Sequence, residues 1–131
     1  MADRLHLEVV TRVRKVVEDE VDEVRLPGVL GELGVLPGHT PLLTALAIGR
    51  LAYTAGGKQH QMVVEQGFAE IQPDRVTVLA REATLPDEVD RDAEQMKYNE
   101  ATEQLKNAGV DDLQEITNRQ RAAEANLQLL D

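Results

Sequence analysis

The sequence lacks two residue types on which much protein chemistry depends, because its 131 residues include no cysteine and no serine. Without cysteine there is no disulfide framework, no thiolate metal site and no thiol nucleophile. The commonest covalent nucleophiles of hydrolases are therefore missing, which leaves only Thr, Lys, Asp, Glu, His or Tyr for such a role. We expect a non-catalytic protein.

Aromatic residues, basic residues and long apolar runs are also scarce. The chain has one phenylalanine, two tyrosines and no tryptophan, and its 14 basic and 24 acidic residues give a net charge of −10. This charge repels phosphate backbones, and few rings are available for base stacking, so we do not expect nucleic-acid binding. No apolar run reaches the roughly 18 residues of a membrane span, and the start lacks the pattern of a secretory signal. We expect an intracellular protein without direct membrane insertion.

The charge is distributed unevenly along the chain. Residues 1–84 carry 12 acidic and 9 basic side chains, a net charge of −3, whereas residues 85–131 carry 12 and 5, a net charge of −7. This shift predicts a boundary near Leu85, with one domain over 1–84 and a second over 85–131.

Apolar residues recur with period two before this boundary. The pattern is clear in 5–10 and 76–81, and Pro-Gly or Gly-Gly turn signals separate the short runs. The stretches 49–54 and 58–64, on either side of a Gly56-Gly57 turn, predict a β-hairpin. Seven or more short strands predict a small sandwich or flattened barrel.

The period changes to that of an α-helix after the boundary. We predict a first helix over 88–107 with Asp87 as its N-cap, and Gly109 as a left-handed C-cap. Asp111 is predicted to begin a second helix, with Gln114 at the spacing of a capping box. So short a link makes the two helices antiparallel.

The predicted second helix carries apolar residues on two sides. Such a helix could exchange between two partners, or it could be held permanently between its sister helix and the sheet; the pattern favours neither. One stripe consists of Leu113, Ile116, Ala123, Leu127 and Leu130 with Gln120 among them, and the other of Ala122, Ala125 and Leu129.

The polar motifs give weak support for chemistry. His39 has no Ser, Cys or paired carboxylate nearby to make it a general base, and the three histidines lack zinc-site spacing. We interpret His6 and His60 as solvent-facing strand residues. The acidic run 18–24 lacks the glycine and glutamate spacing of an EF-hand and is interpreted as a solvated strand face.

Two longer stretches carry a resemblance to a known family. "GELGVLPGHTPLLTAL" and "GGKQHQMVVEQGFAEIQPDRVTVLA", with "LHLEVVT" at the start and "AAEANLQL" near the end, closely resemble the epsilon subunit of the bacterial F-type ATP synthase. The resemblance implies an α+β fold: a flattened antiparallel β-sandwich of about ten strands, followed by an antiparallel two-helix hairpin. It implies a rotor subunit of the central stalk that couples the gamma subunit to the c-ring in proton-driven ATP synthesis.

The resemblance also implies particular contacts. The family's loop contacts to the c-ring fall on Glu32 and His39, with Leu42 as a neighbour. The hairpin can extend along gamma toward the alpha and beta subunits and inhibit hydrolysis, for which Arg119 and Arg121 are the candidates. Such a subunit is not a homo-oligomer, and it lies peripherally at the cytoplasmic face of the cell inner membrane through the complex.

Some members of the family bind ATP through a motif of the form Ile/Leu-Asp-x-x-Arg-Ala. The corresponding stretch here keeps Asp90 but has Ala93 in place of the arginine, so we expect weak or absent ATP binding and no cofactor or metal. The alternative hypothesis is a free-standing small-molecule binding module that uses the hairpin as a lid.

Overall fold

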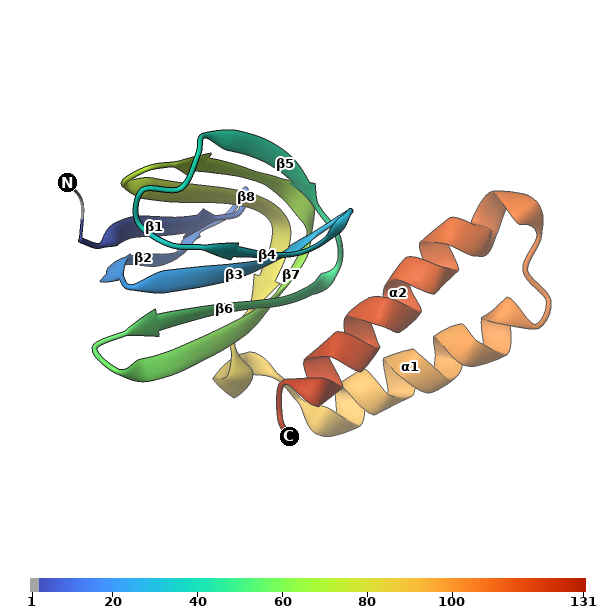
Figure 1. Ribbon diagram of the computed structural model, residues 1–131. Coiled ribbons are helices and arrows are strands. Elements are labelled where there is room, and N and C mark those ends of the chain that lie inside the picture. The colour runs from blue at the N-terminus through green and yellow to red at the C-terminus, as the bar shows by residue number, and fades with distance from the viewer. Residues whose placement is uncertain (1–2) are drawn as a thin grey trace.

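The computed structural model describes residues 3–131 and places a strand-rich half beside a helical hairpin (Figure 1). Residues 1–2, where the predicted first domain begins, lie outside the described residues. The strands are β1 (Leu5–Val10), β2 (Lys15–Val21), β3 (Glu23–Gly28), β4 (Gly31–Val35), β5 (Leu42–Leu46), β6 (Gly49–Ala55), β7 (Lys58–Gln72) and β8 (Arg75–Thr84). A short 3₁₀ helix, η1 (Pro86–Glu88), precedes α1 (Arg91–Leu105) and α2 (Val110–Gln128).

The strands form one sheet that folds over on itself. Its order is β2-β1-β8-β7-β5-β3-β4, and β6 pairs with both β3 and β7. One edge of the 15-residue β7 pairs first with β6 and then with β5, so β7 passes from one part of the sandwich to the other. The described residues therefore contain eight strands rather than the expected ten or so, because single long strands run across both layers.

One strand pair departs from the antiparallel expectation. β1 pairs with β8 in parallel, with Val9 opposite Val78, while β1 and β2 are antiparallel. The first and last strands of the sandwich are joined through the whole intervening chain, so no hairpin forces them to run in opposite directions.

The predicted hairpin is confirmed. Ala55 lies opposite Lys58, and the two residues between them, Gly56 and Gly57, both have positive φ angles, of 59° and 80°. Positive φ at both central positions gives the turn the twist that the flanking strands require.

The core consists of the inward-facing residues of the alternating pattern. Leu, Val, Ile, Met and Ala fill it, and its members include Leu5, Leu7 and Val9 of β1 and Val76, Val78 and Ala80 of β8. Period two therefore predicted which face of these strands is buried.

The first helix begins later than predicted. α1 starts at Arg91, and the side chain of Asp90 accepts a hydrogen bond from the Ala93 N–H at 3.1 Å. Asp87 lies in η1 instead, so its prediction as the N-cap was wrong. Val89 remains extended, which separates the two helical segments.

The connection between the helices also differs from the prediction. Gly109 has an extended backbone, with φ −77° and ψ 167°, and serves as the N-cap of α2 rather than as a left-handed C-cap. α2 therefore begins at Val110, and Asp111 lies in its first turn, so the predicted capping box with Gln114 does not form.

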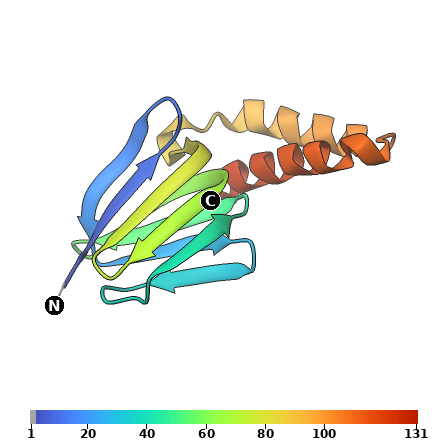
Figure 2. The same ribbon diagram turned by 90° about the horizontal axis from the view of Figure 1, so that it is seen from above.

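The two helices are antiparallel and lie beside one end of the sandwich (Figures 1 and 2). Gln120 donates a hydrogen bond to the Thr102 hydroxyl at 3.0 Å, so the stripe that contains Gln120 faces α1. Ala125, from the other stripe, lines a groove whose opposite wall is the sandwich. In this structure α2 thus turns one apolar side toward α1 and the other toward the sandwich.

Candidate functional site

Glu32 lies on β4 at the side of the sandwich nearest the hairpin. Its Oε1 is 3.2 Å from Nη1 of Arg25, and Nε of Arg25 is 3.1 Å from Oε1 of Glu23. These carboxylates, Glu32 first, raise the pKa of Arg25. Glu32 also borders a groove of about 610 Å³ between the sandwich and α2, together with Arg121 and Glu124.

His39 lies in the loop between β4 and β5. Its backbone N–H donates to the Leu36 carbonyl at 3.1 Å, and its Nδ1 lies 2.6 Å from the carbonyl oxygen of Thr40. The N–H of Gly38 donates to the Pro73 carbonyl at 2.7 Å, which attaches the loop to the β7–β8 turn. The loop is therefore pre-ordered, and Leu42 at the start of β5 is exposed beside it.

The structure does not bring Glu32 and His39 together at one point. Glu32 follows the β3–β4 turn on the side of the helices, whereas the loop of His39 lies at the opposite end of β4 (Figure 1). From Glu32 to Val35 alone the strand extends about 10 Å at 3.3 Å per residue. The two residues thus mark the two ends of β4, which is the last strand in the sheet order.

Exposed apolar side chains surround this strand. The turn before β4 carries Val29 and Leu30, and the loop after it carries Leu36, all exposed to solvent. Val29 and Leu30 thus lie at the Glu32 end of β4, whereas Leu36 and the exposed Leu42 flank His39 in the sequence beyond its other end. Both ends of β4 therefore carry exposed apolar side chains next to a predicted contact residue.

A second apolar patch covers the outer face of the sandwich, and sequence reasoning did not single it out. Phe68 of β7 lies directly opposite Leu79 of β8, and each is 56% exposed. Leu43 of β5 is exposed on the same face, because Ala45, two residues later, lies opposite Phe68. The signal in the sequence was the period-two alternation, which turns Phe68 outward when Ala69 turns inward.

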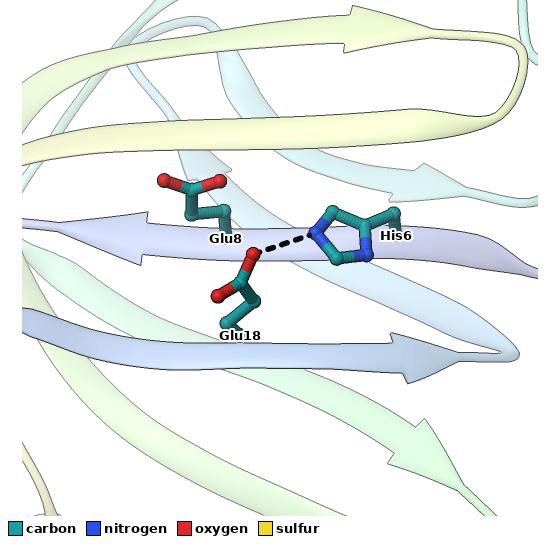
Figure 3. Close-up of side chains that lie close together, drawn as sticks. All are labelled: His6, Glu8 and Glu18. Atoms are coloured by element: carbon teal, nitrogen blue, oxygen red, sulfur yellow. Dashed lines mark hydrogen bonds and ion pairs between the residues drawn. The ribbon is translucent and has the colours of Figure 1, made fainter.

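His6, interpreted from the sequence as a solvent-facing strand residue, is half-buried on β1 within a charged cluster (Figure 3). Its Nε2 lies 3.1 Å from Glu18 Oε2 and its Nδ1 2.8 Å from Glu20 Oε1, and hydrogen bonds to Glu20 and then Glu18 raise the pKa of His6. Ligand atoms of His6, Glu8 and Glu18 lie within 4.8 Å of one another, so these residues could hold a cation. Lys15 Nζ is already 2.9 Å from Glu18 Oε1 and would compete with it.

His60 is exposed on β7, as expected, and its ring stacks on Tyr53 with centroids 4.9 Å apart. The acidic run from Glu18 is exposed for its first three residues, while Val21 is fully buried. The run is thus a solvated strand end that leads into the core.

The remaining predicted residues lie on the hairpin. Asp90 caps α1 with its carboxylate, which leaves that group engaged with the backbone. Arg121 borders the groove along the sandwich, and Arg119 borders a smaller cleft of about 250 Å³ that contains Glu65 and Glu82. In this arrangement both arginines lie beside the sandwich, where they remain exposed.

The linker between sandwich and hairpin is held by one charged contact. Arg14 Nη2 donates to Glu88 Oε1 at 2.7 Å and to the Ala83 carbonyl at 3.3 Å, while Glu88 Oε1 also accepts from the Leu85 N–H. The hydrogen bond from Arg14 and then that from Leu85 lower the pKa of Glu88.

Comparison with known proteins places this fold in a family. The model of the family described as ATP synthase, Delta/Epsilon chain, beta-sandwich domain matches residues 4–86. A protein of Geotalea uraniireducens named ATP synthase epsilon chain is 44% identical over 112 residues, which cover 86% of this chain and 81% of that one. Another of that name from Nitratidesulfovibrio vulgaris is 46% identical and is matched over 80% and 78% of the two chains.

Two solved structures share the fold. A chain in the Euglena gracilis mitochondrial ATP synthase matches with a TM-score of 0.89 at 22% identity, covering 100% of this chain and 84% of that one. A chain in the central stalk and c-ring structure of the Tetrahymena thermophila enzyme matches with a TM-score of 0.70 at 9% identity, covering 99% and 98%.

The chain belongs to the ATP synthase delta/epsilon chain family. Its function is that of a rotor subunit of ATP synthase, a part of an enzyme complex. This assignment favours the rotor hypothesis over the free-standing module with a helical lid. Among the described residues no helix combines the length and apolar character needed to cross a bilayer.

Proposed function

We propose that the chain is the non-catalytic subunit that couples gamma to the c-ring in proton-driven ATP synthesis, with gamma on the outer face of the sandwich and the c-ring along the β4 edge. The observation that carries this proposal is the exposed apolar patch of Leu43, Phe68 and Leu79. The only phenylalanine of the chain lies at the surface rather than in the core. Aromatic anchors in a rigid sheet are typical of permanent protein contacts.

The β4 edge offers a different surface, which suits the c-ring. Glu32 and His39 lie at its two ends, too far apart to bind one small group together. A ring of repeated loops is broad enough to contact both. The exposed leucines near them add apolar area, and the fixed backbone of the His39 loop reduces the entropy lost on binding. A broad contact of this kind transmits torque by adhesion.

The hairpin is proposed as a regulatory domain over residues 85–131, separate from the sandwich domain over 1–84. When extended it reaches alpha and beta, where Arg119 and Arg121 are the candidates for contacts that inhibit ATP hydrolysis. A linker attached to the sandwich chiefly through Arg14 and Glu88 supports such movement, because exposed ion pairs stabilise by at most about 1 kcal/mol. The assembled subunit lies at the cytoplasmic face of the inner membrane.

ATP binding at the start of α1 is proposed to be weak or absent. The carboxylate of Asp90 is already used as the helix cap, and Ala93 offers no cation to a phosphate group. The neighbouring Asp92 and Glu94 add negative charge to the first turn.

The c-ring contact is tested by the double variant Glu32→Ala with His39→Ala, assembled into the complete enzyme in membranes. We expect ATP hydrolysis to continue while the proton pumping that it drives falls. The matched control is Glu103→Ala with His60→Ala, which removes the same two residue types from exposed positions elsewhere. Unchanged coupling in the first variant, or an equal loss in the control, would contradict the assignment.

A further inference from the structure

Three carboxylates meet where the hairpin lies against the sandwich. Glu65 of β7 is directly opposite Glu82 of β8 in an antiparallel pair, so their side chains point to the same face. Glu94 of α1 is only 9% exposed and adds a third negative group at this junction. Like charges placed opposite one another destabilise a strand pair, so this arrangement requires a compensating group.

Helix α2 borders the pair from the other side, where Glu65 is half-buried and Glu82 remains exposed. Glu65 and Glu82 line the cleft of about 250 Å³ whose hairpin wall is formed by Glu115, Asn118 and Arg119. The carboxylate of Glu65 therefore loses water when the hairpin lies against the sandwich.

The nearby cations are largely engaged with other groups. Arg81 Nη1 donates to Gln66 Oε1 at 3.3 Å, and Lys97 Nζ lies 3.3 Å from Glu94. Arg119 borders the cleft on α2 together with a further acid, Glu115. Burial and the charge and hydrogen bond of Glu82 raise the pKa of Glu65 to about 7, against a smaller opposing effect of Arg81.

We propose that Glu65 forms a proton-dependent latch beside Glu82, in which the hairpin docks on the sandwich while Glu65 is protonated. Release of the hairpin exposes Glu65 to water, so Glu65 loses its proton when the hairpin is released. Acid conditions then favour the docked hairpin and alkaline conditions favour its release. The latch rests on the proposed mobility of the hairpin, but not on any contact with gamma or the c-ring.

The size of the effect follows from linkage. A carboxyl group that titrates near pH 7 when covered and at about pH 4.3 when exposed changes the ratio of docked to released hairpin about tenfold between about pH 6 and about pH 8. A change of this size biases the availability of the hairpin.

The test uses the isolated full chain. Because the chain has no cysteine, Lys58→Cys and Val110→Cys provide two unique sites for spin labels, one on the sandwich and one at the exposed tip of the hairpin. The distance distribution between the labels measures the docked fraction. We expect the ratio of released to docked hairpin to rise about tenfold between about pH 6 and about pH 8.

Variants of single carboxyl groups identify the latch. Glu65→Gln mimics the protonated side chain and should leave the docked fraction independent of pH. Glu70→Gln makes the same change at an exposed site of the same strand and should preserve the tenfold response, as should His6→Gln, which removes the histidine whose pKa Glu20 and Glu18 raise. A response that survives Glu65→Gln overturns the proposal.

A direct titration of Glu65 tests the proposal when the released hairpin is too rare to detect in the distances between the spin labels. The side-chain carboxyl carbon of Glu65, followed by NMR in the full chain, should titrate near pH 7. A midpoint near the ordinary value for glutamate, about 4.3, would overturn the latch. The isolated chain is used throughout, so failure of the latch and failure to bind the rotor shaft remain separate results.

Discussion

Replacing Gly67 with alanine tests how the sandwich is built, because this glycine is the corner at which β7 turns from one layer to the other. Gly67 has a φ of +141°, which L-residues rarely adopt, and a Cβ there would lie 2.0 Å from the Leu79 carbonyl oxygen and 2.9 Å from Ala80 Cα. Both obstructing atoms belong to the backbone of β8, so no side-chain rotation can relieve the overlap.

The magnitude follows from two contributions. The backbone conformation alone costs an alanine about 1–3 kcal/mol, and the overlap forces β7 and β8 apart in addition. We therefore expect Gly67→Ala to lower the free energy of unfolding by more than about 3 kcal/mol, a large part of the roughly 5–15 kcal/mol of a typical domain. The outward position of Phe68 would be disturbed as well.

Gly57→Ala is the matched control. Gly57 also has a positive φ, of +80°, but a Cβ there meets no atom within 4 Å. Its cost is limited to the backbone, about 1–2 kcal/mol. Urea unfolding followed by far-ultraviolet circular dichroism gives both values, provided the dependence on urea is the same in both variants. Equal destabilisation by the two substitutions would refute the reasoning about the corner.

Three further predictions concern charge, the hairpin and nucleotides. Because Glu20 and Glu18 raise the pKa of His6 above 6.5, its contribution to stability is complete below that pH and lost as the pH rises through the raised value. His6→Gln should abolish this loss in urea unfolding at a series of pH values; an unchanged pH dependence would show that another group is responsible. Deletion of residues 85–131 should raise ATP hydrolysis by the assembled enzyme, and unchanged hydrolysis would show that the hairpin does not inhibit. Calorimetry with ATP should detect no tight binding, and a micromolar dissociation constant would contradict the proposed role of Asp90.

Local sequence patterns predicted much of the fold because the alternation within each strand and the residues of each turn lie in short stretches of the chain. Alternation identified the buried faces of β1 and β8, and the Gly56-Gly57 turn fixed one hairpin and its register. The change of period near Leu85 separated the strands from the helices, and β8 ends at Thr84.

The errors arose where several local signals competed or where long-range pairing decided the outcome. Asp87 and Asp90 are both good caps, and Asp90 alone has a helix following it that continues without interruption. The parallel pairing of β1 and β8 joins the two ends of the domain, which no turn signal can reveal.

The functional surfaces depend even more on tertiary structure. Glu32 and His39 are close in sequence, yet the extended strand between them places them at opposite ends of an edge. Glu65 and Glu82 are far apart in sequence, yet strand pairing makes them neighbours beside α2. Neither relation follows from residue spacing without the register of the sheet.

The most direct test of the rotor assignment is the stoichiometry of binding to purified gamma, measured by analytical ultracentrifugation. We predict a one-to-one complex that Phe68→Glu abolishes and that Met96→Glu, a like change at a 71% exposed residue of α1, leaves intact. Failure of the unmodified chain to bind gamma, or equal binding by both variants, would contradict the assignment of gamma to the outer face of the sandwich.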